Sequence, residues 1–305
     1  MPLFTGGNCE AVQLSFRIGQ LNPIAGGKET KVRHGSILGE LNRFGRSILR
    51  NMSNNQPLRL SPSAVSEYQN CPLLYRYRKI DKLPEPPSLD AERGTLVHTV
   101  LHDLFESAAA TRTPQTAIDL LPSRWRAQIE AKPELNELVT NEKEWLDRAA
   151  SLLETYFTVE DPKAFEATHR EIHLENDLTE TIYLHGYVDR LDVAQTGEVR
   201  IVDYKSGKAP KPGWEEKALF QLRVYALLYW KNNGVLPRLL QLIYLGDGKL
   251  VKSQPTLADL ESTEKTLMRV AKDISTSIEK DYWPPNPTRL CDWCFFKKIC
   301  PAHNP

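Results

Sequence analysis

The chain has 305 residues, of which 41% are hydrophobic and 26% are charged, as is typical of a water-soluble globular protein. Its 39 basic and 39 acidic residues cancel, so any nucleic-acid-binding surface must be a local cluster of charge. No apolar run approaches the roughly 20 residues that cross a bilayer, and the opening residues, MPLFTGGNCEAV, do not follow the plan of a signal peptide. We therefore expect a cytoplasmic protein whose five cysteines serve as metal or redox ligands in preference to disulfides.

Residues 1–57 differ from the rest of the chain because they contain eight glycines and little sustained periodicity. Only the stretch 37–49 hints at a short helix, so we predict a poorly ordered N-terminal extension. Met52 stands just before the first strong folding signal and is a candidate for the true start of the protein. Cys9 is isolated in this extension and receives no role.

From residue 58 onward, apolar spacing predicts a folded domain over 58–290, with a helical insert at 111–160 and a cysteine-rich segment at 284–305. Ser61 is a good N-cap residue and Pro62 suits the first helical position, so a short helix begins there and ends near Cys71. The stretch that follows, YRYRKIDKLPEPP, runs into a proline-rich loop. Further helices are predicted at 92–110, 114–131, 139–159, 215–232 and 256–280. Strands are predicted at 165–174, 181–193, 198–205 and 239–245. This order predicts an α/β protein with a mixed central sheet flanked by helices.

The strands that contain GYVDRLDV and VRIVDYKSG have a self-consistent antiparallel register. Pairing Val193 with Val199 also pairs Leu191 with Ile201 and Asp192 with Arg200. Extended further, the same register puts Asp189 opposite Asp203 and Tyr187 opposite Lys205.

Directly opposed carboxylates repel unless one is protonated or a cation lies between them. Two acids and Lys205, which shares a face with Asp203, can hold Mg²⁺ and orient a water for attack on a phosphodiester. An Asp-x-Lys triplet alone is a weak signal, and the opposition of Asp189 makes it a stronger one.

Two helical patterns have both a structural and a functional interpretation. Gln221 and Tyr225 are four residues apart on one helix face, where they orient Lys205 or simply belong to a half-buried amphipathic helix. His98 borders the apolar arc of ERGTLVHTVLHDLF, and by itself it is more often a core residue than a metal ligand.

Three cysteines near the C-terminus, Cys291, Cys294 and Cys300, have the spacing C-x2-C-x5-C, which is a strong ligand signature. Cys71 is the natural fourth ligand, and like Cys300 it precedes a proline, as does one ligand of bacterial ferredoxin motifs. Structural zinc is the main alternative to an iron–sulfur cluster. Either group would tie the two ends of the folded segment together as a clasp.

Taken together, these motifs resemble the RecB-like branch of the PD-(D/E)xK nuclease superfamily, and in particular its iron–sulfur members. Those members are the AddB C-terminal nuclease and the CRISPR-associated RecB-type exonucleases. The resemblance covers residues 58–301. The matching segments are SPSAVSEYQNCP, GTLVH, GYVDR, VDYKSG, QLRVY and the three C-terminal cysteines.

The resemblance implies a restriction-endonuclease-like fold and a Mg²⁺ or Mn²⁺ site built by His98, Asp189, Asp203 and the backbone carbonyl of Tyr204. Lys205 would position the attacking water, assisted by Gln221 and Tyr225. The same resemblance implies a 4Fe–4S cluster whose four ligands are Cys71, Cys291, Cys294 and Cys300.

The function that follows is a metal-dependent deoxyribonuclease, with an exonuclease on single-stranded or frayed DNA ends in repair or recombination as the leading interpretation. The alternatives are a non-catalytic iron–sulfur DNA-binding module in a repair complex and a zinc protein with an unrelated hydrolase site. The sequence contains no GxxxxGK[ST] motif, so unwinding would need a separate helicase or other repair proteins as partners. Several basic and aromatic residues are candidates for contacting the strand, although each is equally compatible with packing or with a solvated surface: Arg76, Arg78, Lys79, Lys208, Lys211, Lys297, Lys298, Tyr75, Tyr77, Trp214 and Phe295.

Overall fold

The computed structural model describes residues 56–304. The interpretations of Cys9, Met52 and the short helix over 37–49 concern residues outside this range. Among the described helices, none combines the length and apolarity that crossing a lipid bilayer requires.

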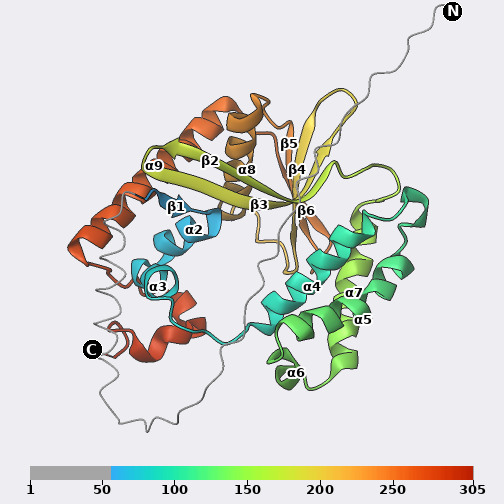
Figure 1. Cartoon of the computed structure of the whole chain (residues 1–305), viewed down its shortest axis with the longest axis horizontal. Coiled ribbons are helices and arrows are strands. Elements are labelled where there is room, and N and C mark those ends of the chain that lie inside the picture. Colours follow the sequence, from blue (N-terminus) through green and yellow to red (C-terminus); the bar gives the residue numbers. More distant parts are fainter. Residues whose placement is uncertain (1–55, 305) are drawn as a thin grey trace, which may run out of the picture. The chain divides into compact units, whose positions relative to one another are not determined.

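A six-stranded sheet forms the centre of the described chain (Figure 1). The strands are β1 (Leu58–Leu60), β2 (His169–Thr179), β3 (Ile182–Val193), β4 (Val199–Lys205), β5 (Leu239–Tyr244) and β6 (Lys249–Ser253). The α-helices are α2 (Pro62–Asn70), α3 (Pro72–Tyr75), α4 (Leu89–Leu104), α5 (Pro114–Ala131), α6 (Leu135–Leu138), α7 (Glu142–Val159), α8 (Glu216–Asn233) and α9 (Leu257–Lys280). Short turns of other helix types are η1 (Arg76–Ile80), η2 (Ala109–Thr111), η3 (Arg289–Trp293) and η4 (Phe295–Ile299).

Strand β3 organises the sheet because three strands pair with it. β2 follows one edge of β3 along nearly its whole length in antiparallel orientation. The other edge is shared: β1 pairs with residues 182–184 in parallel, and β4 pairs with residues 190–193 in antiparallel orientation. Among the described residues, no strand pairs with this edge over 185–189, and we call this opening the fork. The parallel pairing of β4 with β5 and the antiparallel pairing of β5 with β6 complete a mixed sheet, as predicted.

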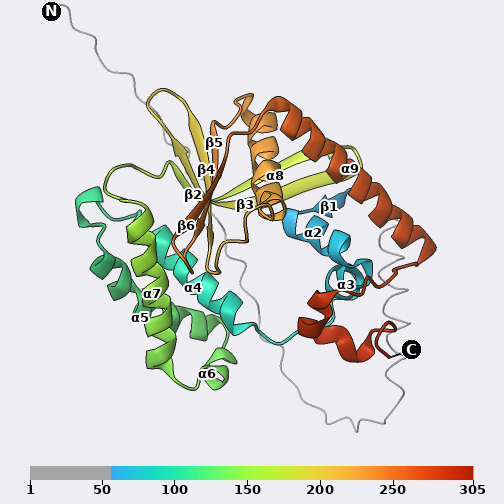
Figure 2. The same cartoon turned by 180° about the vertical axis from the view of Figure 1, so that it is seen from behind.

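Helices cover the two faces of the sheet and bury separate hydrophobic clusters against it (Figures 1 and 2). On one face, α2, α3, α8 and α9 pack on Leu184, Val188 and Ile201. On the other face, α4 packs on Val202 and Tyr204, and the helices α5, α6 and α7 of the predicted insert extend this cluster. Alternate residues of β4 therefore belong to different clusters, as the two-residue period of a strand requires.

Local sequence signals explain where several helices begin and end. The Ser61 hydroxyl accepts a hydrogen bond from the amide of Ala64 at the start of α2, as the N-cap prediction required. Thr256 and Asp259 form a reciprocal capping box on α9. Gly234 ends α8 in the left-handed conformation, with φ of 68°.

The structure differs from the sequence prediction at several places. The residues after Cys71, predicted as the approach to a loop, form α3 and the π-helical turn η1. Strands β1 and β6 were not predicted, because three and five residues carry too little periodicity to be recognised. The helix predicted over 139–159 begins at Glu142, where Asn141 caps it, and residues 135–138 form α6 as a separate turn.

Candidate active site

His98 and Asp189 meet beside the fork. α4 brings the Nδ1 atom of His98 to 3.5 Å from Oδ1 of Asp189. The other carboxylate oxygen of Asp189 accepts a 2.7 Å hydrogen bond from the backbone amide of Tyr204 on β4. Burial alone would lower the pKa of His98, but the hydrogen bond and charge of Asp189 outweigh it and the net shift is upward.

Glu171 on β2 is a third potential ligand at this place, and the sequence reasoning missed it. Its carboxylate lies with His98 and Asp189 in a group whose ligand atoms are all within 4.8 Å of one another. Its backbone has φ of +47°, which is rare for a residue with a side chain and is found preferentially at functional sites. Burial and the negative charge of Asp189 raise the pKa of Glu171.

The positive φ of Glu171 coincides with a break in the alternation of β3. Val188 and Leu191 are three residues apart, yet both pack into the same hydrophobic cluster. Asp189 and Arg190 between them are therefore both directed to the side where α4 lies. The β2–β3 register shifts at an irregularity between Asp177 and Thr179. A register counted from the β2–β3 turn without this shift would not place Glu171 opposite Asp189.

Asp203, Lys205, Gln221 and Tyr225 form a second, connected group on the α8 side of the fork. The Gln221 amide nitrogen donates to Oδ1 of Asp203 at 2.8 Å and to the Tyr225 hydroxyl at 2.7 Å. Lys205 donates to the amide oxygen of Gln221 at 2.8 Å. Gln221 therefore contacts both the acid and the lysine of the Asp-x-Lys motif, which favours the orienting role that the helix-face pattern left open.

Asp203 is buried and under electrostatic strain. Its Oδ2 atom forms an ion pair with Lys205 Nζ at 2.7 Å, and its Oδ1 atom accepts the hydrogen bond from Gln221. Burial, followed by the charge of Asp189, raises the pKa of Asp203 to about 6. A buried carboxylate in this condition fits a site that accepts a cation.

The predicted hairpin register is correct as far as the ladder extends. Val193 pairs with Val199, Leu191 with Ile201 and Asp192 with Arg200. The ladder ends at Arg190 and Val202, so the predicted pairs Asp189–Asp203 and Tyr187–Lys205 do not form. The strands separate because the Asp189 side chain, and not its backbone, takes the next amide of β4. Tyr187 pairs with His173 of β2 on the opposite edge of β3, and Lys205 is directed to Gln221 of α8.

Arg190 holds Tyr204, the residue whose backbone amide positions Asp189. Its side chain is 1% exposed and lies within 3.1 Å of carboxylate oxygens of both Glu160 and Asp192. It also donates a 2.6 Å hydrogen bond to the hydroxyl of Tyr204. The positive charge of Arg190 is therefore neutralised by buried acids, and its rigid set of donors fixes the tyrosine that holds Asp189.

A glycine lets α8 approach the sheet. A Cβ atom at Gly186 would lie 2.6 Å from the ring of Tyr225, closer than real contacts permit. Tyr225 therefore packs directly on the backbone of β3 because residue 186 has no side chain.

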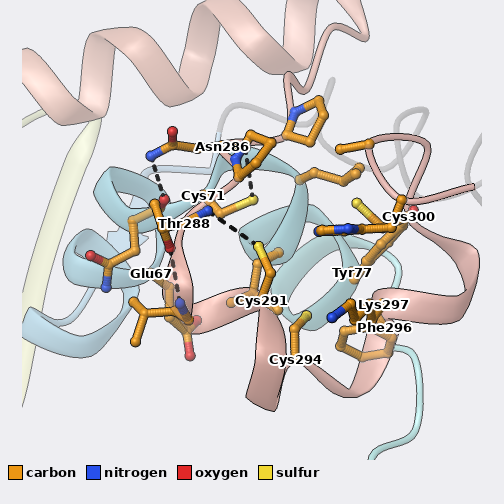
Figure 3. Close-up of a pocket in the computed structure, with 18 of the residues that line it drawn as sticks. Glu67, Cys71, Tyr77, Asn286, Thr288, Cys291, Cys294, Phe296, Lys297 and Cys300 are labelled. Atoms are coloured by element: carbon orange, nitrogen blue, oxygen red, sulfur yellow. Dashed lines mark hydrogen bonds between the residues drawn. The ribbon is translucent and has the colours of Figure 1, made fainter. Parts of the chain in front are cut away.

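The four predicted cluster ligands come together beyond the C-terminal end of α2 (Figure 3). Cys71 and the three C-terminal cysteines all line one pocket, with Arg78, Phe296 and Lys297 among its walls. Backbone amides of Asn286 and Thr288 donate to the sulfur atoms of Cys71 and Cys291 at 3.5 and 3.4 Å. Burial raises the pKa of Cys294, and the nearby thiols add to this shift. The four cysteines form no disulfide with one another.

Among the aromatic candidates for contacting DNA, two are committed to packing. Tyr75 is buried against Trp283, which favours packing, one of the interpretations that the sequence left open for it. Tyr77 packs on Phe296, and its hydroxyl donates to the backbone of Ile299 in the cysteine segment. Trp214 and Phe295 are exposed and stay candidates.

Comparison with known proteins identifies the family of this chain. The family model of the PD-(D/E)XK nuclease superfamily matches residues 59–301. The chain belongs to this superfamily. The triplet Asp203-Tyr204-Lys205 has the pattern of an acid and a lysine separated by one residue, for which the PD-(D/E)XK superfamily is named.

Two curated relatives and one solved structure show what this PD-(D/E)XK chain is similar to. The Gene 69 protein of Mycobacterium phage D29 is 29% identical over 77% of this chain and 94% of its own length. One subunit of the ATP-dependent helicase/deoxyribonuclease of Streptococcus mutans is 27% identical over 72% of this chain, which spans only 21% of that protein. A provisionally named exonuclease from Eubacterium rectale has the same fold, with a TM-score of 0.51, 13% identity, and coverage of 80% of this chain and 88% of the other.

Proposed function

We propose that this protein is a Mg²⁺- or Mn²⁺-dependent deoxyribonuclease, and specifically an exonuclease on single-stranded or frayed DNA ends in repair or recombination. The observation that supports it is that the group of His98, Glu171 and Asp189 and the Asp203–Lys205 pair lie close enough for the charge of Asp189 to raise the pKa of Asp203. The deoxyribonuclease named among the relatives is compatible with this substrate. Because the sequence contains no GxxxxGK[ST] motif, we propose that strand separation is supplied by a separate helicase.

The donor set fits a hard divalent cation. We propose that His98, Asp189, Asp203 and the carbonyl of Tyr204 would hold the ion. Glu171 lies with His98 and Asp189 in one group of potential ligand atoms and would be a further carboxylate. Asp203 is buried and the charge of Asp189 opposes its ionisation, so a bound cation would stabilise its carboxylate strongly. When bound, the ion supplies Lewis-acid activation of the phosphodiester and of a water.

The residues around the ion have separate roles in the proposed reaction. Lys205 stabilises charge on the attacked phosphate and orients the water, because Gln221 holds its ammonium at the partly exposed end of the motif. Gln221 and Tyr225 keep Asp203 in place through a continuous hydrogen-bond chain. The Tyr204 amide keeps Asp189 directed at the same point.

End-labelled single-stranded DNA tests this function directly. We expect digestion that requires Mg²⁺ or Mn²⁺, stops with chelator, and falls at least about 100-fold in Asp203→Ala and Lys205→Ala. Lys252→Ala on the exposed side of β6 is a matched control and should digest at the wild-type rate. Equal digestion by all four proteins would defeat the assigned site, and the position of the surviving label reports exonuclease action and its polarity.

We also propose that Cys71, Cys291, Cys294 and Cys300 hold a 4Fe–4S cluster as a structural clasp. A tetrahedral zinc ion with Zn–S bonds of about 2.3 Å would need sulfurs about 3.8 Å apart. Among the described residues, none of these sulfurs belongs to a group of three ligand atoms within 4.8 Å of one another. A cluster spreads its ligands over several iron atoms, so a wider set of sulfurs fits it better. Hydrogen bonds to the sulfurs, such as the amides of Asn286 and Thr288 donate, also tune such clusters.

Anaerobic purification distinguishes the two metals. We expect a brown protein that absorbs near 400 nm and contains iron and acid-labile sulfide, with the colour lost in Cys71→Ser. Cys9→Ser serves as the matched control and should stay brown. A colourless protein with one zinc per chain would replace the cluster with the zinc alternative.

A further inference from the structure

A row of aromatic and imidazole rings extends along β2 and β3 away from the metal-ligand candidates. Tyr187 stacks on His173 with ring centroids 4.6 Å apart and planes 29° apart. His173 and His185 follow at 5.8 Å, and His185 and Tyr183 at 5.8 Å. The guanidinium of Arg59 lies 4.2 Å above the ring of Tyr183 and ends the row. We call Tyr187, His173, His185 and Tyr183 the ring track.

The ring track begins beside the candidate active site. Side chains two apart on a strand share a face, so Tyr183, His185 and Tyr187 lie on the same face as Asp189. The intervening residues Leu184 and Val188 are buried in the hydrophobic cluster of the other face. The end of the β2–β3 hairpin at which β2 turns into β3 lies away from the helices α5–α7, as both views of the chain show (Figures 1 and 2).

Tyr187 is more exposed than a structural ring pair requires. One face of its ring is covered by His173, yet 57% of the residue is exposed. Residue 187 belongs to the stretch 185–189 of β3 that forms the fork, where no described strand pairs with this edge. Cross-strand ring pairs stabilise sheets by covering apolar surface, and this one leaves a ring open two residues from Asp189.

The charges along the ring track favour bases over phosphates. Glu175 accepts a hydrogen bond from the Tyr183 hydroxyl and lies 3.4 Å from His173, and Asp177 is opposite Tyr183. These carboxylates repel a phosphate backbone on the β2 side. Burial, with the charges of Arg59 and His173, lowers the pKa of His185, which favours the uncharged form of this ring.

We propose that the ring track binds single-stranded DNA by stacking unpaired bases, with Tyr187 contacting the base nearest the scissile phosphate. This inference rests on the proposed nuclease function, since it describes how the strand reaches that site. Bases of a duplex are already stacked on each other and are not free to stack on side chains, so the ring track selects single strands. Stacking on aromatic rings does not depend on base identity, and the selection is therefore independent of sequence.

Binding by an inactive protein tests the ring track separately from catalysis. In an Asp203→Asn background with Mg²⁺ present, we expect Tyr187→Ala to bind a fluorescent oligothymidylate about tenfold more weakly, since one stacked base is lost. Tyr187→Phe should bind within about twofold of the parent because it retains the ring. Tyr282→Ala is the matched control: Tyr282 is 64% exposed but lies beyond the end of α9. A fully paired, blunt-ended duplex should bind all four proteins equally.

Unchanged oligothymidylate affinity in Tyr187→Ala, or an equal loss for the duplex, would overturn the inference. Thermal melts of each variant establish that it is folded, and Tyr187→Phe reports on the ring even if the alanine variant melts early. The failure of the nuclease proposal looks different. In that case the wild-type protein would bind single-stranded DNA through Tyr187 but would not digest it.

Discussion

The backbone amide of Tyr204 donates a 2.7 Å hydrogen bond to the carboxylate of Asp189, at the place where the β3–β4 ladder stops. One residue of β4 thus positions the acid of β3, while its neighbour in sequence, Asp203, is the second acid of the candidate site. The hydroxyl of the same tyrosine is held by Arg190. The geometry of both acids therefore depends on the short segment 202–205, and on the buried charges beneath it.

Replacing Asp203 by asparagine should stabilise the metal-free protein at neutral pH. The raised pKa of about 6 means that the folded protein keeps a proton that the unfolded chain has lost above its ordinary pKa of 3.8. Stability due to this group is therefore highest below pH 4 and falls as the pH rises through about 6. We expect Asp203→Asn to gain up to about 3 kcal/mol at pH 7.5 in chelator, measured by urea unfolding.

The pH profile of Asp203→Asn separates this effect from simple repacking. The stability gain should disappear below pH 4, where both folded and unfolded wild-type chains are protonated. Mn²⁺ should then reverse the order at pH 7.5, because the ion stabilises only the wild-type site. A gain that persists unchanged at pH 4 would contradict the electrostatic cause.

Replacing Arg190 by methionine should destabilise the fold by about 3–5 kcal/mol, because Glu160 and Asp192 lose a buried partner. Chemical unfolding curves measure this loss. Arg200→Met is the control, since Arg200 contacts the same two acids but its side chain is 26% exposed. We expect a smaller loss there, and equal losses would show that burial of the charge is not the cause.

Gly186→Ala should cost about 1–3 kcal/mol, because the new methyl group overlaps the Tyr225 ring. Tyr225→Leu removes the obstructing ring edge. If the clash is the cause, adding Gly186→Ala to Tyr225→Leu should cost much less than adding it to the wild type. Additive losses in this double-mutant cycle would assign the effect of Gly186 to its backbone alone.

Glu171→Gln tests the ligand that sequence reasoning missed. Removing one negative charge from the group with His98 and Asp189 should weaken Mn²⁺ binding about tenfold in calorimetric titrations. Glu180→Gln, in the exposed turn that follows β2, is the control and should bind as the wild type does. Unaltered affinity in Glu171→Gln would exclude Glu171 from the ion site.

The fold could be predicted from the sequence where long periodic segments decide it. α5 and the hairpin register from Arg190 to Val193 follow from apolar spacing and cross-strand pairing. Glu171 was not predictable, because its place depends on a left-handed backbone and on a β2–β3 register with an irregularity. Arg190 was visible only as a charged residue beside Asp189. Its burial depends on Glu160, which lies 30 residues away in the chain.

The cysteine pocket has a consequence for how the protein is made. Asn286 contacts Cys71 across 215 residues of chain, so the first cysteine leaves the ribosome long before its partners. At synthesis rates of about 5–20 residues per second, this thiol waits roughly 10–40 seconds. During translation α2 and α3 therefore carry an unshielded, oxidisable sulfur. Conditions that slow elongation should therefore lower the yield of correctly assembled protein, even though they do not change the free energy of unfolding of the finished chain.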